Sequence, residues 1–504
     1  MNGKTVLRWG MLLVLLAVFA CGLIISLVPS GMYEGLTCMG IPVMSETELE
    51  RLGKYQYRDY SENLKFRNEY VAVDQERSVI YIPQSIAQDT VAADLGGTLT
   101  IDIPGKKLYF APDGYWDDLS GAVRKGHPFK LLVTGSMENY MVYDVIFTTL
   151  PVISMHGQLL YKDSEYREVL SGRIVLWDPE TSETMAGGVH WHIRGKSASG
   201  QDKKPWKLSL KNREGKNRNE SFLGLGSDDD WILNAMNMED SNVREKLFMD
   251  LWNEVAEESG HNYAMSRGEY AEVLVNGEYS GLYLLQRRVD EKYLHLSTAD
   301  VLLKAYYENG DISCEYSTAY KGDETQKNLI DGYFWEEDMS CLSTDNFVDV
   351  TLFLQLFCAK DNLSYKNMYY LFSGPENGYE VCLIPWDTDA ALGVGWNPET
   401  EQFIYDYENG LNAAINRWEW QSMEQMHPDL NDRLRSRWQE LRQSIFTKEH
   451  LWEKLDEYYA KLDQSGAPAR DQERWGLFFE GNDTAEKAYC FLEERLAILD
   501  DYYS

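Results

Sequence analysis

Cysteine is scarce in this chain. Seven cysteines are scattered over 504 residues, without a CxxC pair and without zinc-ligand spacing. This pattern argues against a disulfide scaffold and against a zinc ribbon. Cys358 and Cys382 stand inside apolar runs, so we expect both to be small core residues.

Positive charge is also in short supply. The chain has 48 Lys and Arg residues against 81 Asp and Glu residues, which leaves a formal net charge of -33. A nucleic-acid partner would require a basic face, so we expect none. Basic or Ser-rich polypeptides are better candidates for a partner, although the charge can also serve solubility alone.

Several catalytic motifs are absent. The chain has eight histidines but no HExxH, and it has neither GxxxxGK[ST] nor GxSxG. These absences argue against a zincin protease, a P-loop NTPase and a serine hydrolase. His190 and His192 lie on one face of a predicted strand, and we interpret them as a structural pair and not as a metal site.

One long apolar run is present, from Trp9 to Val28. About twenty apolar residues match the thickness of a bilayer core and exceed the apolar part of a typical signal peptide. Lys4 and Arg8 precede the run, and an acidic flank follows it. We therefore expect residues 1–30 to be a cytoplasmic tip and a single transmembrane helix in the cell membrane, with the body of the protein outside.

The rest of the chain divides into two predicted regions. Residues 31–147 contain a polar stalk and then short alternating segments separated by Gly, Pro and Asp, a pattern typical of a small β-rich domain of unknown role. Residues 148–504 mix strand patterns with helical stripes, so the expected fold class is α+β. Asn276-Gly277 between two β-rich runs predicts a hairpin over 272–285.

Helices are predicted where apolar residues recur on one face. Such stripes run through about 241–258 and through the segment after about 428, and a buried helix is expected over 347–358. A second hairpin is predicted from 368–372 and 379–384. The apolar residues that define the two stripes are Val243, Leu247, Leu251 and Val255, and then Leu430, Leu434, Trp438, Leu441 and Ile445.

A set of oxygen-bearing side chains follows the buried helix. Asp361 lies where a loop should start, Asn367 begins the next strand, and Asp387 ends the strand after it. Kinase-type enzymes supply a base and two metal ligands in this order. Asp361 is the candidate base, Asn367 and Asp387 are oxygen ligands of the type that Mg2+ prefers, and Asp389 adds a second carboxylate. The structural alternative is that these carboxylates cap helices or turns.

A loop after the strand predicted over 189–193 is a weaker candidate site. Arg194, Gly195 and Ser197 combine a cation, flexible backbone and a hydroxyl, as a phosphate-binding loop requires. Lys204 and Lys207 follow within reach of such a phosphate. The alternative is that both lysines are solvated side chains beside a strand.

Together these motifs resemble the spore-coat CotH kinase family over about residues 150 to 480. That family has an atypical protein-kinase-like fold, and its spore-coat members phosphorylate serines of other coat proteins with ATP and a divalent metal. The resemblance implies Asp361 as catalytic, Asn367 and Asp387 as metal-binding, and 194–207 as part of the nucleotide site. The matching segments are Leu150-Pro151-Val152-Ile153-Ser154, Ile193-Arg194-Gly195-Lys196-Ser197, Lys204-Pro205-Trp206-Lys207, Asp230-Trp231-Ile232-Leu233-Asn234-Ala235, Val243-Arg244, Val275 to Leu285, Asp361 with Asn367-Met368-Tyr369-Tyr370, Pro385-Trp386-Asp387-Thr388-Asp389, Arg470-Asp471 and Arg474-Trp475.

The expected function is that of a membrane-anchored, outward-facing CotH-like protein kinase. It would transfer phosphate from ATP, with Mg2+ or another divalent cation, to Ser of surface or envelope polypeptides. A non-catalytic surface-binding or adhesion protein on the same scaffold is the alternative, because Gln286 stands where the family often has Glu and Lys196 where it usually has Asn. A carbohydrate hydrolase, based on Asp387, Asp389 and 15 tryptophans, is a third possibility.

Overall fold

The computed structural model describes most of the chain after residue 36. The predicted membrane anchor lies outside the described residues. Within the described part, none of the helices is both long and apolar enough to cross a bilayer. The described ranges are 37–38, 41–44, 59–84, 98–112, 129–136, 139–158, 168–181, 183–195, 198–260, 263–306, 312–316, 324–362, 366–374, 378–397, 399–400, 402–405 and 418–504.

The chain forms two compact units. The N-terminal unit comprises residues 1–155, 175–186 and 274–279, and the C-terminal unit comprises the remainder. The domain limits drawn from the sequence stay predictions. All of the candidate site residues belong to the C-terminal unit.

The N-terminal unit is built from short strands around one core. Its larger sheet has the strand order β5-β6-β10-β9-β8, and a smaller sheet has the order β4-β3-β7. Strands β6 and β10 are parallel, and the other pairs in these two sheets are antiparallel. Ile80, Leu131 and Val133 are fully buried in the core. The strands are β1 (Thr37–Cys38), β2 (Ile41–Pro42), β3 (Leu64–Phe66), β4 (Glu69–Tyr70), β5 (Ala72–Asp74), β6 (Val79–Pro83), β7 (Leu99–Ile101), β8 (Lys107–Pro112), β9 (Phe129–Ser136) and β10 (Asn139–Thr148).

A closed barrel follows, with the strand order β11-β12-β13-β14-β17-β19-β18. Its alternating burial is clearest in β14, where Trp206, Leu208 and Leu210 are buried while Lys207 and Ser209 between them are partly exposed. This alternation places the lysine on the outer face of the barrel. The hairpin predicted around Asn276-Gly277 is formed by β18 and β19. The barrel strands are β11 (Val152–Gly157), β12 (Leu170–Trp177), β13 (Thr184–Ile193), β14 (Trp206–Lys211), β17 (Asp230–Asn234), β18 (Gly268–Val275) and β19 (Glu278–Arg287), and a small hairpin is made by β15 (Glu220–Ser221) and β16 (Ser227–Asp228).

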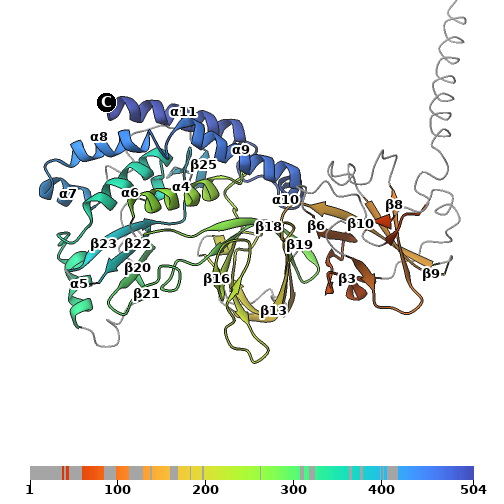
Figure 1. Cartoon of the computed structure of the whole chain (residues 1–504). Helices are drawn as coiled ribbons and strands as arrows, with labels where there is room; N and C mark the ends of the chain where they lie inside the picture. Colours follow the sequence, from red (N-terminus) through yellow and green to blue (C-terminus); the bar gives the residue numbers. More distant parts are fainter. Residues whose placement is uncertain are drawn as a thin grey trace, which may run out of the picture. The chain divides into compact units, whose positions relative to one another are not determined.

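The rest of the C-terminal unit combines a four-stranded sheet with helices (Figure 1). The sheet has the order β21-β20-β22-β23, and helix α6 contacts β23. The predicted apolar stripes are buried in α4, α6 and α8, so the α+β fold class is confirmed. The elements are β20 (Val301–Tyr306), β21 (Ile312–Tyr316), β22 (Lys366–Ser373), β23 (Glu380–Pro385), β24 (Val394–Asn397), β25 (Gln402–Tyr405), α4 (Arg244–Ser259), α5 (Glu324–Trp335), α6 (Thr344–Phe357), α7 (Trp420–Met426), α8 (Leu430–Leu441), α9 (Lys448–Ser465), α10 (Ala467–Trp475) and α11 (Ala485–Tyr502).

Helix α10 is bonded to barrel strand β19. The Asp471 carboxylate forms an ion pair of 2.9 Å with Lys203, whose ammonium also donates to the Leu282 carbonyl of β19. The Trp475 indole donates to the Ser280 carbonyl at 2.9 Å. Gly281 has a φ of 113°, and a Cβ atom there would lie 2.0 Å from Asp471, so this close approach requires glycine. The Arg470-Asp471 and Trp475 segments therefore join the last helices to the barrel.

Candidate functional site

The residues predicted as base and metal ligands meet at one end of strands β22 and β23. Asp361 lies in the short 3-10 helix η5 (Lys360–Asn362), Asn367 near the start of β22, and Asp387 two residues after β23. The Asn367 amide donates to Asp361 Oδ2 at 3.0 Å and toward the Asp387 carbonyl at 3.4 Å. Three segments that are separated in sequence thus share one site.

A buried asparagine holds these segments together. Asn362 is 0% exposed, and its amide donates to the carbonyls of Asn367 at 2.9 Å and Trp386 at 2.8 Å. The backbone N–H of Trp386 in turn donates to the Asn367 carbonyl at 3.0 Å. Asn362 therefore positions both candidate ligand segments, a role that its place beside Asp361 in the sequence does not reveal.

The backbone at the site adopts an uncommon conformation. The φ angles of Cys358, Asn367 and Asp387 are 49°, 52° and 56°, all in the left-handed region. Non-glycine residues reach this region at a cost of about 1 to 3 kcal/mol, and such residues cluster at functional sites. Asn and Asp tolerate it best, which agrees with the residue types at two of the three positions.

Asp361 is partly screened from water. Its side chain is 16% exposed and forms an ion pair with Lys366 at 2.5 Å. Burial raises the pKa of Asp361, and the charge of Asp387 adds to this, while Lys366 and Asn367 oppose the rise. A carboxylate with a raised pKa is a better proton acceptor near neutral pH than an exposed one.

Helix α4 starts beside the site, and a carboxylate caps its first turn. Glu239 accepts from the backbone N–H groups of Arg244 and Glu245, both at 2.9 Å, and so satisfies two donors of the first turn. The Arg244 guanidinium is 1% exposed. It donates to the Asp389 carbonyl at 3.1 Å and forms an ion pair with Asp483 at 2.5 Å. Arg244 thus ties the segment after β23 to the loop before α11.

The same helix brings a further carboxylate to the site. Glu245 is 4% exposed, and no described residue forms a hydrogen bond or ion pair with its carboxylate. Burial raises the pKa of Glu245 well above its usual range, and so do the charges of Asp387, Glu239 and Asp389. The pKa of Asp389 is likewise raised, first by burial and then by Asp387 and Asp361. Several negative groups therefore crowd around Asp387.

Sequence reasoning missed Glu245. The residue directly follows Val243-Arg244, a segment that was identified as part of the resemblance, and it lies in the first turn of a predicted helix. An acidic residue in a first turn is ordinarily explained by the helix dipole. Its burial beside Asp387 becomes visible in three dimensions.

A divalent cation fits this set of oxygen donors. No described residue forms an ion pair with the carboxylates of Asp387, Asp389 or Glu245, and none hydrogen-bonds the carboxamide oxygen of Asn367. In the described ranges, no three His, Cys, Asp or Glu side chains are close enough to hold a metal ion by themselves. Mg2+ usually takes one or two carboxylates and completes its shell with water and phosphate. The ligand assignments to Asn367, Asp387 and Asp389 stay predictions.

Two cations lie close to the Trp386 ring. The Lys304 ammonium is 4.5 Å from the ring centroid, and the Arg194 guanidinium is 5.8 Å from it. Burial lowers the pKa of Lys304 to about 7, and Arg194 adds to this while Asp387 opposes it. Lys304, on β20, was missed in the sequence because a single lysine in a predicted strand has no recognisable spacing.

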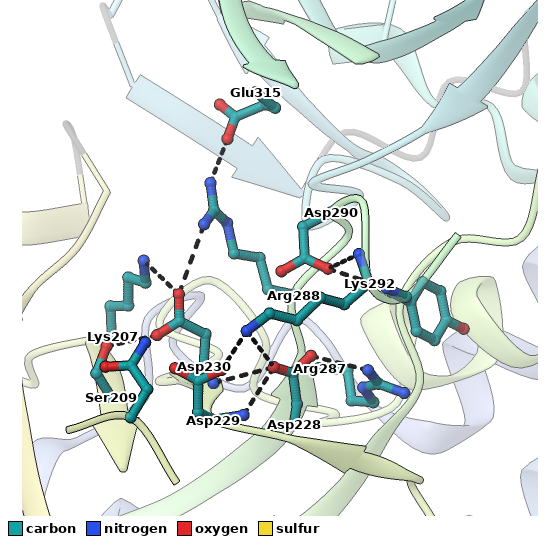
Figure 2. A network of polar contacts seen from close by, with 12 residues as sticks. Lys207, Ser209, Asp228, Asp229, Asp230, Arg287, Arg288, Asp290, Lys292 and Glu315 are labelled. Atoms are coloured by element: carbon teal, nitrogen blue, oxygen red, sulfur yellow. Dashed lines mark hydrogen bonds and ion pairs between the residues drawn. The ribbon is translucent and has the colours of Figure 1, made fainter. Parts of the chain in front are cut away.

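The two lysines of the predicted phosphate site form contacts elsewhere. Lys207 forms an ion pair of 3.0 Å with Asp230, which Arg288 also approaches at 3.6 Å (Figure 2). Lys204 donates to the backbone carbonyls of Ser199 and Gln201. Gly195 has a φ of 78°, which agrees with a turn. Ser197 lies outside the described residues.

The side-chain amide of Gln286 is buried and forms no hydrogen bond with the described residues. The residue is 1% exposed on β19, and neither its amide nitrogen nor its amide oxygen has a partner in the described part of the chain. A buried carboxamide without partners costs free energy, so it marks either a ligand contact or a tolerated loss.

A comparison with protein families gives one match. The family described as CotH kinase protein matches residues 191–499, which is more than half of the chain and includes Arg194, Asp361, Asn367 and Asp387. A comparison with curated proteins finds no match. Together with the motifs and their convergence in space, the family match shows that this chain belongs to the CotH kinase family.

Proposed function

We propose that this protein is a metal-dependent kinase that transfers the terminal phosphate of ATP to Ser hydroxyls of polypeptides. Membership of the CotH kinase family gives a kinase-like function in general terms. The observation that carries the finer proposal is the meeting of Asp361, Asn367 and Asp387, joined by the two hydrogen bonds of the Asn367 amide.

Asp361 is the proposed base. Its carboxylate accepts the proton of the attacking Ser hydroxyl, while a bond forms from the hydroxyl oxygen to the terminal phosphorus and the bond from phosphorus to the bridging oxygen breaks, which releases ADP. Lys366 favours the ionised carboxylate at pH 7, and burial opposes it. The Asn367 amide fixes the carboxylate orientation, and this leaves the Asn367 oxygen for a metal.

Asp387, Asp389 and Asn367 are the proposed metal-binding residues, with Glu245 beside them. Bound Mg2+ would neutralise charge on the phosphate oxygens. The crowded carboxylates support this proposal because a cation relieves their mutual repulsion.

The proposed acceptor is a basic polypeptide. A cavity of about 1020 Å³ lies against α9 and α10, and six carboxylates and Lys203 line it. Asp471 and Asp483 are paired with Lys203 and Arg244, whereas Asp202 and Asp463 have no ion pair among the described residues. Arg244 connects this cavity to the site, since it binds both Asp483 of the lining and the Asp389 carbonyl. The carboxylates are Asp202, Glu239, Asp240, Asp463, Asp471 and Asp483. The net charge of -33 acts in the same direction. The predicted membrane anchor would present this site outside the cell.

A transfer assay tests the function. The full chain is incubated with labelled ATP, Mg2+ and a peptide rich in Ser and Arg, beside the Asp387→Ala variant. Label on the peptide that depends on metal and falls about 1000-fold or more in the variant is expected, since a bound metal supplies several kcal/mol of transition-state stabilisation. Equal labelling by both proteins would refute the proposal.

A non-catalytic binding protein on this scaffold remains the second candidate, and Gln286 is the observation that favours it. The Glu that the family often has at this position would provide a charge, and the buried amide has no described partner in its place. If the chain has lost catalysis in this way, Gln286→Glu should create metal-dependent transfer that the unchanged protein lacks. Transfer by the unchanged protein argues against this candidate.

A further inference from the structure

The cations near the site fall into two classes. Lys207, Arg288 and Lys366 are each paired with a carboxylate of the same unit. By contrast, no described residue forms a hydrogen bond or ion pair with the guanidinium of Arg194, whose described side-chain contact is the Trp386 ring. An arginine held over an aromatic face with its five donors unused is suited to an anionic ligand.

Lys304 faces the same ring from the sheet. Its ammonium lies 4.5 Å from the ring centroid of Trp386 and 4.9 Å from that of Tyr369, and these two rings meet edge to face at 5.6 Å. Register explains this arrangement, because Lys304 pairs with Tyr369 across β20 and β22. Cation-π attraction to both rings favours this position of the ammonium.

We propose that Arg194 and Lys304 together bind the phosphate groups of the nucleotide beside Trp386, and that Lys204 and Lys207 do not. This inference rests on the proposed function and assigns the phosphate-binding role within the same site. Trp386 adjoins Asp387 in the chain, so the two cations and the proposed metal ligand would contact the same polyphosphate from different sides.

The charges around Lys304 support an anion at this place. Burial is the main cause of the lowered pKa of its ammonium; Arg194 and Arg288 also act to lower this pKa, whereas Asp387 and Glu315 act to raise it. Glu315 is itself paired with Arg288 (Figure 2), so the charge of Arg288 partly compensates the charge of Glu315. A bound phosphate would offset the repulsion between Arg194 and Lys304.

The contacts of Lys207 and Lys204 explain why we no longer assign phosphate binding to these two lysines. Lys207 shares Asp230 with the hydroxyl of Ser209 and with Arg288, a network that is complete without a ligand (Figure 2). Lys204 donates to the carbonyl of Ser199, which lies in the 3-10 turn 198–200, and to the carbonyl of Gln201, which directly follows that turn. Moving either lysine to a phosphate would break contacts that the fold already provides.

Binding measurements on the full chain test the inference. Calorimetric titration with a non-hydrolysable ATP analogue and Mg2+ is done for the unchanged protein and for Lys304→Met, Lys304→Arg and Arg194→Met. Each Met variant should bind the analogue about 10- to 100-fold more weakly, which corresponds to one lost charge-assisted hydrogen bond. Lys304→Arg should recover part of the loss. Lys448→Met, which removes an exposed lysine paired with Glu493, is the control and should bind normally.

A second titration separates binding from folding. Mn2+ alone, followed by its paramagnetic resonance signal, should bind to Lys304→Met as tightly as to the unchanged protein or more tightly, because a positive charge near Asp387 is gone. Loss of both Mn2+ and analogue binding, with a lower unfolding temperature, would mean a structural role and overturn the inference. Normal analogue binding by both Met variants would also overturn it and leave the proposed function intact. An unchanged protein that binds no nucleotide with any divalent metal would refute the proposed function itself.

Discussion

Two carboxylate clusters in the C-terminal unit differ in whether the described residues provide cations that pair with them. In the Asp228–Asp230 cluster each carboxylate has a cation within the chain: Arg287 and Lys292 serve Asp228, and Lys292 also serves Asp229 (Figure 2). Lys207 and Arg288 serve Asp230. Among the described residues, each of the three carboxylates therefore has at least one ion-pair partner.

The Asp387 cluster, which consists of Asp387, Asp389 and Glu245, lacks such partners in the described part of the chain. Burial and mutual repulsion raise the pKa of Glu245 and of Asp389. Two acidic clusters that look alike in the sequence therefore have different roles in the folded protein. Where the fold supplies the counter-charge, the cluster stabilises structure, and where it does not, the cluster is suited to a ligand.

The largest expected effect concerns Asp361, the proposed base next to the Asp387 cluster. Asp361→Asn should lower the rate of phosphate transfer by about 100- to 10,000-fold, the contribution typical of a general base. Analogue binding in the presence of Mg2+ should change little, since Asp361 is paired with Lys366 and not with the proposed cations. Single-turnover transfer and calorimetric titration measure the two quantities. Lys366→Met is the companion variant, and a similar loss of transfer there would move the catalytic role from the carboxylate to the ion pair.

The proximity of Asp361, Asn367 and Asp387 could be predicted from sequence because it is local. Asn367 and Asp387 stand at neighbouring ends of two strands joined as a hairpin, so antiparallel pairing brings them together. Asp361 precedes the first of these strands by a few residues in the chain, which keeps it close to them. The α+β class and the buried stripes of α4 and α8 follow from periodicity in the same way.

Glu245, Lys304 and the pairing of Lys207 could not be predicted, for a different reason. Glu245 and Lys304 come from elements more than fifty residues before Asp361, and their approach to Asp387 and Trp386 depends on packing of α4 and β20. Lys207 meets Asp230 because β14 and β17 pair in one register, and periodicity does not specify register across a barrel.

The Asp228–Asp230 cluster should respond to mutation with lost stability. Asp228→Ala removes the buried partner of Arg287, and breaking such a pair costs about 3–5 kcal/mol because a charge is left uncompensated. Denaturant unfolding of the C-terminal unit measures this loss. Arg433→Ala, which removes an exposed ion pair with Asp429, is the control and should change the free energy of unfolding by less than about 1 kcal/mol. A similarly small effect of Asp228→Ala would remove the contrast between the two clusters.

The smallest effect should have the opposite sign. Glu245→Gln keeps the shape of the side chain but removes one charge from the Asp387 cluster, so without metal it should raise the free energy of unfolding by about 0.5–2 kcal/mol. In excess Mg2+ the order should reverse, because the unchanged protein binds the cation more tightly and gains more stability from it.

The pH dependence of this difference follows from the raised pKa of Glu245. The folded protein holds this proton to higher pH than the unfolded chain, whose Glu titrates near 4.5. The stabilisation from the protonated carboxyl is therefore complete below about pH 4.5 and is lost as pH rises through the folded pKa. Glutamine cannot lose a proton, so the gain from Glu245→Gln should be small near pH 4.5 and grow toward pH 8. Burial disfavours the ionisation of Glu245 most, the charges of Asp387, Glu239 and Asp389 disfavour it further, and Arg194 favours it. Thermal unfolding in EDTA across this pH range measures the gain, and a gain that is constant with pH would mean that Glu245 is already neutralised by the fold.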